Sequence, residues 1–500
     1  MTDPTLRRLA LSTMLPAFPG TTAPPWAIRL LKEGLAGYTL FGYNIVDRAQ
    51  LATLVTQLRD ANPDVLLALD EEGGDVTRLS YHEGSPYPGN AALGAADDPE
   101  LTRATYRGIG LELATVGINV NFAPTVDVNS ADENPVIGTR SFGADPALVS
   151  RHTAAAIDGL QSAGVAGCAK HFPGHGATVS DSHLELPTIT DSLAVMRGRD
   201  LPPFQAAIDA GVRMIMTAHI RVPELTGDSP ATASGRVLND LLRDELGFTG
   251  AVVTDALEMR GASGAIGLPE AAVRALLAGA DLLCLGSDIN EALCESIVDG
   301  IVFAARGGRL PVARLEEAVA RGAASVADLK PVAAESAEAV RDAIRTAARR
   351  AVRVEGSLPP LKEPLLVQLG SESNIAVGTV PWGLPLEGEL VTVSISQNGA
   401  PYLGPSAADL SAVAGDRDIV VVGRDTHRWP QARALIEALA ARHPAVVVVE
   451  MGWPSAWRPA GVSAFVTTHG ASRANGQAAA EVLGAPRDAA SPGTGTAELV

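Results

Sequence analysis

Short apolar runs alternate with stretches of helical periodicity through the first two-thirds of the chain. The helical stretches place apolar residues three and four positions apart, as in Leu51, Leu54, Val55 and Leu58, and this spacing gathers them on one helical face. The apolar runs expected to form strands are residues 9–18, 38–41, 65–70, 118–122, 164–170, 214–219, 251–255 and 281–285. Eight strands that alternate with helices predict a (β/α)8 barrel of the TIM type. A doubly wound open sheet is the alternative, although the sequence has no GxGxxG after a strand and no P-loop.

The same alternation begins again after residue 364, which predicts a second, smaller α/β domain. Residues 331–353 are rich in alanine and predict a long helix, and the proline-rich segment 357–364 has the composition of a linker. The strands expected beyond it are residues 365–369, 390–395, 418–422, 445–450 and 464–468, with a helix at 431–441. We therefore expect the barrel at 1–332, a helix and linker at 333–364, and the C-terminal α/β domain at 365–500.

The composition limits the partners and the compartment. The formal charge of −18 argues against nucleic acid and against an anionic membrane surface as partners. Cys168, Cys284 and Cys294 lie in apolar contexts, which predicts small core residues in a reducing compartment. The first residues lack the pattern of a secretory signal, and no apolar run is long enough to span a bilayer. These features predict a cytoplasmic protein.

Titratable side chains are concentrated on one loop, which follows the apolar run 164–170. Residues 170–183 contain Lys170, three histidines and Asp181, and Pro173 with two glycines forbids regular structure there. A plain surface loop is one interpretation of this segment. A metal site is a second, and its ligands would be His171, His175, Asp181 and His183, although His171 and His175 cannot share a helical face across a Pro-Gly pair. The third, which we favour, is an acid/base loop in which Asp181 orients His183 and keeps it able to donate a proton.

Further polar groups follow other predicted strands, as the active site of a barrel requires. Asp70 ends the run 65–70, Asp127 follows 118–122, and His219 ends 214–219. Asp255 ends the apolar run 251–255, and its position on rigid backbone makes it the natural nucleophile. A retaining glycoside hydrolase needs such a carboxylate and a second group that protonates the leaving oxygen, which a histidine held by an aspartate can do. The hydroxyls of one sugar ring are bound by charged groups that pair donors with acceptors. The candidates for this role are Asp70, Arg78, Arg140, Lys170 and His171.

Several motifs resemble those of one enzyme family. KHFPGHG at 170–176, followed by DSH at 181–183, resembles the signature of the glycoside hydrolase family 3 β-N-acetylhexosaminidases of the NagZ type. LFGYN at 40–44, DEEGGDVTR at 70–78, GTRSFG at 138–143 and VVTDALEM at 252–259 are similar to further blocks of that family, in the same order. VVVVEMGWP at 446–454 resembles the second domain of its two-domain members. Asp75 stands where many relatives carry a basic residue.

The resemblance implies a fold, an activity and a set of residue roles. It implies a barrel, a retaining mechanism with Asp255 as the nucleophile, and His183 as the acid/base with Asp181 as its partner. The residues implied in sugar binding are Asp70, Arg78, Arg140, Lys170 and His171. The implied substrates are glycosides with β-linked N-acetylglucosamine (GlcNAc), chiefly peptidoglycan fragments recycled in the cytoplasm. Phosphate stays open as an acceptor, since a histidine does not repel it as a carboxylate would. We expect neither a metal nor a cofactor.

Two rival functions remain open at this point. In family 3 β-glucosidases the acid/base is commonly a glutamate from a later part of the chain, for which Glu372 and Glu450 are the candidates here. A glutamate at the end of a strand is more often structural, and the pair Asp181 and His183 makes a second acid redundant. The other rival is a non-catalytic sugar-binding protein, whose expected mark is loss of Asp255 or His183. Neither residue is lost. For His175 we expect a structural role, and His219 is either a core histidine or a support for the site.

Overall fold

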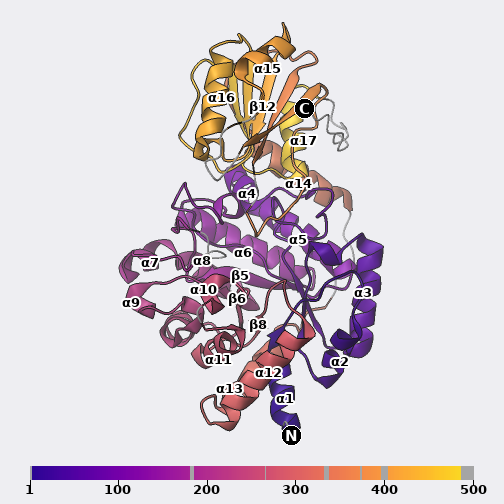
Figure 1. The fold of residues 1–500 in the computed structure, drawn as a ribbon, viewed down its shortest axis with the longest axis vertical. Helices are drawn as coiled ribbons and strands as arrows, with labels where there is room; N and C mark the ends of the chain where they lie inside the picture. Colours follow the sequence, from indigo (N-terminus) through magenta and orange to yellow (C-terminus); the bar gives the residue numbers. More distant parts are fainter. Residues whose placement is uncertain are drawn as a thin grey trace. The chain divides into compact units, whose positions relative to one another are not determined.

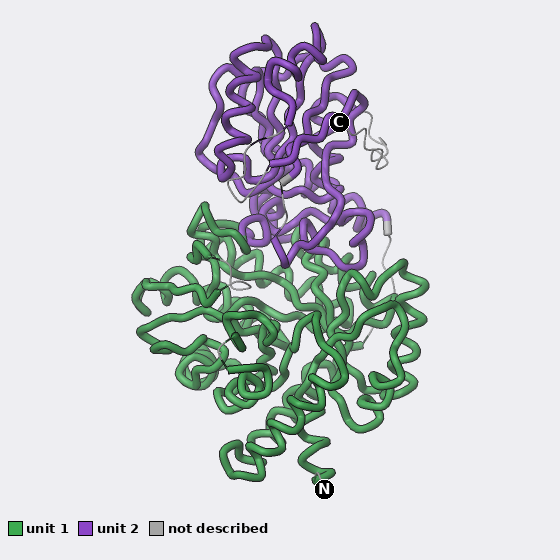
Figure 2. Tube along the Cα trace, in the orientation of Figure 1, with its two compact units in different colours: residues 1–72, 102–137, 143–337 green, residues 73–101, 138–142, 338–500 purple. Residues whose placement is uncertain are grey.

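The computed structural model describes residues 3–180, 185–264, 266–330, 337–371, 374–395, 402 and 404–485 (Figure 1). The contacts between these residues divide the chain into two compact units (Figure 2). The first unit comprises Met1–Glu72, Thr102–Ile137 and Gly143–Ala337, and the second comprises Gly73–Leu101, Gly138–Phe142 and Glu338–Val500. The predicted domain boundaries remain predictions. The second unit draws two segments from the first third of the chain.

The first unit is a closed parallel barrel. Its strands are β1 (Met14–Leu15), β2 (Gly37–Thr39), β3 (Leu66–Leu69), β4 (Val120–Asn121), β5 (Ala166–Phe172), β6 (Met214–Thr217), β7 (Ala251–Thr254) and β8 (Leu283–Cys284). Strands β2 to β7 pair in sequence order, and β8 pairs with β1. Backbone hydrogen bonds close the two remaining gaps, because Thr254 N donates to Leu282 O at 3.0 Å and Thr39 N donates to Pro16 O at 2.9 Å. The open sheet is therefore excluded.

Helices surround these strands (Figure 1). Their bounds are α1 (Pro4–Leu11), α2 (Pro25–Glu33), α3 (Arg48–Ala61), α5 (Pro99–Thr115), α6 (Pro146–Ser162), α7 (Leu193–Arg199), α8 (Pro202–Asp209), α9 (Pro223–Thr226), α10 (Arg260–Ser263), α11 (Leu268–Ala278), α12 (Glu291–Arg306) and α13 (Val312–Ala324), with a π-helical stretch at Arg236–Glu245. Helix α3 illustrates why they form, since the Asp47 side chain caps it by accepting from Gln50 N at 2.8 Å. Its predicted apolar face, which includes Leu51 and Leu58, is buried.

The first predicted strand needs correction. Residues 9–11 belong to α1, and only Met14–Leu15 of the predicted run 9–18 pairs as a strand. The helix starts early because Asp3 accepts hydrogen bonds from Thr5 N and Leu6 N, and Pro4 fits the first helical position. The apolar residues that suggested a strand are therefore partly the buried face of a helix.

The core of the barrel consists mostly of small and medium side chains, with Phe122 as its one aromatic member among the buried residues of this cluster. Its members alternate along the strands, as Leu66 and Ala68 do on β3 and Met214 and Met216 do on β6. Cys168, Cys284 and Cys294 are free and buried, as predicted. The described helices include none that is long and apolar enough to cross a bilayer.

The second unit is a three-layer α/β sandwich. Its sheet has the order β11-β10-β12-β13-β14-β9. The strands are β9 (Arg353–Gly356), β10 (Leu365–Ser371), β11 (Glu389–Ile395), β12 (Ile419–Gly423), β13 (Val446–Glu450) and β14 (Ala464–Thr467), and the helices are α4 (Asn90–Ala96), α14 (Ala337–Ala351), α15 (Ala407–Ala414), α16 (Pro430–Ala440) and α17 (Arg473–Val482). Helices α15 and α16 pack on one face of the sheet, and α17 packs on the other. The five predicted strands are confirmed.

Strand β9 escaped prediction for a physical reason. It pairs antiparallel with β14 at the edge of the sheet, and all four of its residues are exposed. A solvated edge strand needs no apolar run, so the sequence carries no strand pattern there.

Asp75 joins the segment 73–101 to two other segments of the second unit by hydrogen bonds. The Asp75 carboxylate is half-buried, and it accepts hydrogen bonds from Thr139 Oγ1 at 2.6 Å and from Ala471 N at 2.8 Å. Burial raises the pKa of Asp75, and the positive charge of Arg424 opposes that rise. Asp75, which departs from the basic residue expected there, thus has a structural role within this unit.

Candidate active site

A buried lysine joins two carboxylates at the carboxyl end of the barrel strands. Lys170 lies near the end of β5, and its side chain is 2% exposed. Its Nζ is 2.7 Å from Asp70 Oδ1 and 2.8 Å from Glu72 Oε1. Asp70 directly follows β3, and Glu72 Oε2 accepts a hydrogen bond from Thr125 Oγ1 at 3.2 Å. A buried ammonium is stable only with such partners, so the three charges form one unit.

The next residue along β5, His171, is oriented by a buried aspartate. Its Nδ1 is 2.8 Å from Asp127 Oδ2, and Asp127 Oδ1 accepts a hydrogen bond from His175 N at 2.6 Å. Burial favours a raised pKa for Asp127, but the charge of His171 and its hydrogen bond outweigh burial and hold the pKa below its usual value. The carboxylate is therefore ionised and can only accept, so Nδ1 of His171 must donate. Asp127 thus binds Nδ1 of His171 and not the other ring nitrogen, Nε2.

His175 has the properties of a structural residue. It is 2% exposed, its Nδ1 is 2.8 Å from Thr178 Oγ1, and its carbonyl accepts from Asn134 Nδ2 at 3.0 Å. Burial lowers the pKa of His175 to about 4, so the ring is neutral near neutral pH and cannot serve as the acid. The adjoining Gly176 is required by space, because a Cβ there would lie 1.8 Å from the carbonyl oxygen of Val128.

Asp255 follows β7 at the same end of the barrel. It is half-buried, its backbone N is 3.3 Å from Thr217 O, and its Oδ1 accepts from Ala256 N at 2.7 Å. Its charge acts on groups inside the barrel, since burial raises the pKa of Cys284 to about 12 and Asp255 adds to that rise. Parallel strands in a barrel end at one rim, so this carboxylate shares the rim with Asp70, Lys170 and His171.

Comparison with known proteins identifies the family. The glycosyl hydrolase family 3 N-terminal domain matches residues 26–324. The chain belongs to this family. A β-hexosaminidase A from Pseudoalteromonas piscicida is 39% identical over 285 residues, which are 52% of this chain and 48% of that protein. The chain thus spans about half the length of that relative. A β-hexosaminidase from Stenotrophomonas maltophilia is 35% identical over 301 residues, which are 59% of this chain and 87% of that protein.

A solved structure extends the likeness to both units. The family 3 β-N-acetylglucosaminidase from Paenibacillus sp. str. FPU-7 is 31% identical, covers 96% of each chain and superposes with a TM-score of 0.84. The resemblance to two-domain β-N-acetylhexosaminidases of family 3 is confirmed, and so is the predicted fold of a barrel followed by a smaller α/β domain.

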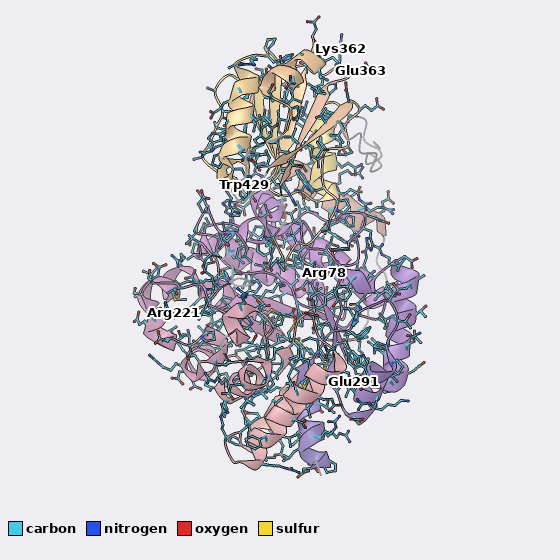
Figure 3. The ribbon with its side chains drawn as sticks, in the orientation of Figure 1. Arg78, Arg221, Glu291, Lys362, Glu363 and Trp429 are labelled. Atoms are coloured by element: carbon cyan, nitrogen blue, oxygen red, sulfur yellow. The ribbon has the colours of Figure 1, made fainter. Side chains whose placement is uncertain are left out.

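Not all predicted site residues of this family 3 chain fall in the barrel unit. Arg78 and Arg140 belong to the second unit and are each 7% exposed. Arg78 (Figure 3) donates from Nη2 to Ala376 O at 3.0 Å, and the Arg140 carbonyl accepts from Asn90 Nδ2 at 2.7 Å. Asp181 and His183 lie outside the described residues. Among the described residues, no group of three or more His, Cys, Asp or Glu is arranged to hold a metal ion.

Sequence reasoning missed two carboxylates of this rim. Glu72 was not predicted as a partner of Lys170, although its burial between Lys170 and Thr125 makes it part of the same cluster. Glu258 accepts from Ser287 N at 2.6 Å and from Asp288 N at 2.8 Å, and so ties the loop after β7 to the loop after β8. Both lie inside quoted motifs, at 70–78 and 252–259, but their partners are distant in sequence, so the sequence spacing does not predict these contacts.

Glu450, the candidate acid of the β-glucosidase alternative, is occupied within the second unit. It is 2% exposed rather than facing solvent as strand-end glutamates often do. Its carboxylate accepts from Asp425 N at 2.8 Å, from Gly452 N at 2.7 Å, and from the backbone and hydroxyl of Thr426. It therefore braces the loop that leads from β12 to Trp429 and α16 (Figure 3). The other candidate, Glu372, lies outside the described residues.

This buried carboxyl makes the stability of the second unit depend on pH. Burial, reinforced by the charge of Asp425, raises the pKa of Glu450 from 4.5 to about 7. Between these values the folded state keeps a proton that the unfolded state has released, so the contribution of Glu450 to stability is full below about pH 4.5 and is lost as pH rises through 7. The expected loss is about 3 kcal/mol. Glu450→Gln cannot titrate, so its unfolding curves, measured at several pH values, should lack this loss. Equal pH dependence in both proteins would contradict the assignment.

Proposed function

We propose that this protein is a retaining exo-β-N-acetylglucosaminidase that removes β-linked GlcNAc from the non-reducing end of its substrates. The observation that carries the proposal is the pair of charge clusters at the barrel rim, Lys170 with Asp70 and His171 with Asp127, beside Asp255. The names of the relatives, β-hexosaminidase and β-N-acetylglucosaminidase, support the choice of sugar.

The sugar-binding roles follow from the chemistry of the rim. Lys170 and Asp70 offer a donor and an acceptor 2.7 Å apart, a spacing that suits two neighbouring hydroxyls of one ring. His171 adds a third polar atom through Nε2, in an orientation that Asp127 fixes. Arg78 and Arg140 complete the proposed set of sugar-binding residues, on the strength of their motifs alone.

The proposed reaction has two displacement steps at the anomeric carbon. Asp255 attacks that carbon while the bond to the leaving oxygen breaks, and His183, oriented by Asp181, donates a proton to that oxygen. A glycosyl-aspartate intermediate results. His183 then takes a proton from water, the water oxygen bonds to the anomeric carbon, and Asp255 departs as a carboxylate. With phosphate in place of water the product would be the sugar 1-phosphate.

The proposed substrates are peptidoglycan fragments that carry β-linked GlcNAc, cleaved in the cytoplasm. The test is kcat/KM on an aryl β-N-acetylglucosaminide and on the matching β-glucoside, each with and without phosphate. We expect the acetamido sugar to be preferred by about 10²-fold or more. Preference for the plain glucoside would overturn the proposal in favour of a β-glucosidase. A sugar 1-phosphate formed only with phosphate would identify phosphate as the acceptor.

His183→Ala should lower kcat/KM more for substrates whose leaving group needs a proton than for substrates whose leaving group does not. An alkyl or sugar leaving group is expelled poorly without protonation, whereas an activated nitrophenolate leaves readily. We expect kcat/KM to fall by about 10³-fold on a GlcNAc disaccharide, and by about tenfold or less on the nitrophenyl glycoside. His82→Ala, a change of an exposed histidine, serves as the control. An equal loss on both substrates would refute the acid role.

A further inference from the structure

His219 lies in the barrel core, close to the backbone that follows Asp255. It comes two residues after the end of β6 and is fully buried. Its Nε2 is 3.1 Å from the carbonyl oxygen of Ala256, and its Nδ1 is 2.8 Å from Thr232 Oγ1. Ala256 is the residue directly after Asp255. The sequence left open whether His219 is a core residue or a support for the site. Its hydrogen bond to the residue after Asp255 favours a support for the site.

The direction of the hydrogen bond to Ala256 is fixed by chemistry. A carbonyl oxygen can only accept, so Nε2 of His219 must donate. The other side of the ring is held by Thr232, whose Oγ1 also lies 2.7 Å from Thr217 Oγ1 and 3.0 Å from Ala218 O. The ring therefore cannot rotate without breaking buried hydrogen bonds on both of its edges.

Ala256 is held at both ends of its backbone. Its N–H donates to Asp255 Oδ1 at 2.7 Å, and its carbonyl receives the His219 proton. The chain beyond it packs on the same histidine, because a Cβ at Gly261 would lie 3.2 Å from His219 Cβ. His219 thus supports the segment from Asp255 to α10 through a polar contact and a close packing contact.

We infer that His219 is a positioning residue for the nucleophile. It sets the position of the Ala256 carbonyl, and the backbone N–H of the same residue donates to the Asp255 carboxylate. This inference rests on the proposed function, in which Asp255 attacks the sugar. A displacement of about 1 Å from the attacking geometry can cost about 10²-fold in rate. None of the groups proposed to bind the sugar belongs to the segment that His219 supports, so loss of His219 should lower kcat and leave sugar affinity nearly unchanged.

The test compares two variants of matched size. His219→Leu removes both ring nitrogens, whereas in His219→Gln the side-chain amide can still donate toward Ala256. We expect kcat on the aryl β-N-acetylglucosaminide to fall by about 10- to 100-fold in His219→Leu and to recover most of that loss in His219→Gln. The inhibition constant for free GlcNAc should stay within about twofold of the parent in both.

Other outcomes would overturn the inference. Equal losses in the two variants, an unchanged kcat in His219→Leu, or a GlcNAc inhibition constant that rises in step with the loss of kcat would each do so. If His219→Leu does not fold, the test moves to Thr232, whose hydroxyl contacts the His219 ring. Thr232→Val removes this hydroxyl and Thr232→Ser keeps it, so kcat should fall only in Thr232→Val. Asp255→Ala, measured in parallel, separates the two proposals. Activity retained in that variant overturns the proposed function, whereas its loss beside an unaffected His219→Leu overturns only the positioning role.

Discussion

Asp255→Ala should lower kcat by at least about 10⁴-fold while the protein unfolds at the parent temperature. The reason is that the variant lacks the carboxylate that the proposed function assigns to the covalent intermediate. Asp255 is half-buried and directly follows the end of β7, so we expect its truncation to leave the barrel folded. The measurement is kcat on an activated aryl glycoside together with a thermal unfolding curve.

The matched control for that prediction is Asp299→Ala, the same chemical change at an exposed position of α12. It should leave both kcat and the unfolding temperature unchanged. Residual activity of more than about 1% in Asp255→Ala would assign the nucleophile elsewhere. Loss of a catalytic nucleophile lowers kcat by several orders of magnitude, so a variant that keeps this much activity still has its nucleophile. A fall in unfolding temperature would instead give Asp255 a structural role.

The barrel could be predicted because the sequence patterns that indicate its strands are local. Each strand is a short apolar run, and several site residues stand where such a run ends, as Asp70 and Asp255 do. A parallel barrel brings all those ends to one rim, so the order of polar groups along the chain already indicates a common site. The family motifs then assign roles that chemistry alone leaves open.

What escaped prediction depends on contacts between distant residues. Glu72 and Lys170 are far apart in sequence, and only the pairing of β3, β4 and β5 brings them together. Likewise, nothing near Asp75 shows that it accepts from Ala471 N, nearly 400 residues later. Edge strand β9 lacks an apolar face, and α1 was hidden because a helix and a strand can both bury a short apolar run.

Lys170→Met is expected to damage both stability and activity. Lys170 is the shared partner of Asp70 and Glu72, and methionine fills a similar volume without the charge. Glu72 is 2% exposed, so the variant leaves a buried carboxylate beside a second carboxylate of like charge. Loss of one partner from a buried ion pair costs about 3–5 kcal/mol in the free energy of unfolding. Denaturant unfolding measures this cost, and Lys32→Met, at an exposed position of α2, is the control.

A second substitution separates the two effects of Lys170. Glu72→Gln removes the buried negative charge that Lys170 balances in the parent, so the double variant should regain about 1–3 kcal/mol relative to Lys170→Met alone. Its kcat/KM should not recover, because the proposed function places the Lys170 ammonium on a sugar hydroxyl, and neither substitution restores that donor. Recovery of stability without activity is therefore the signature of a lysine that both balances the cluster and binds substrate. If activity returned with stability, Lys170 would serve only to hold the fold, and the sugar contact would have to come from Asp70 and His171.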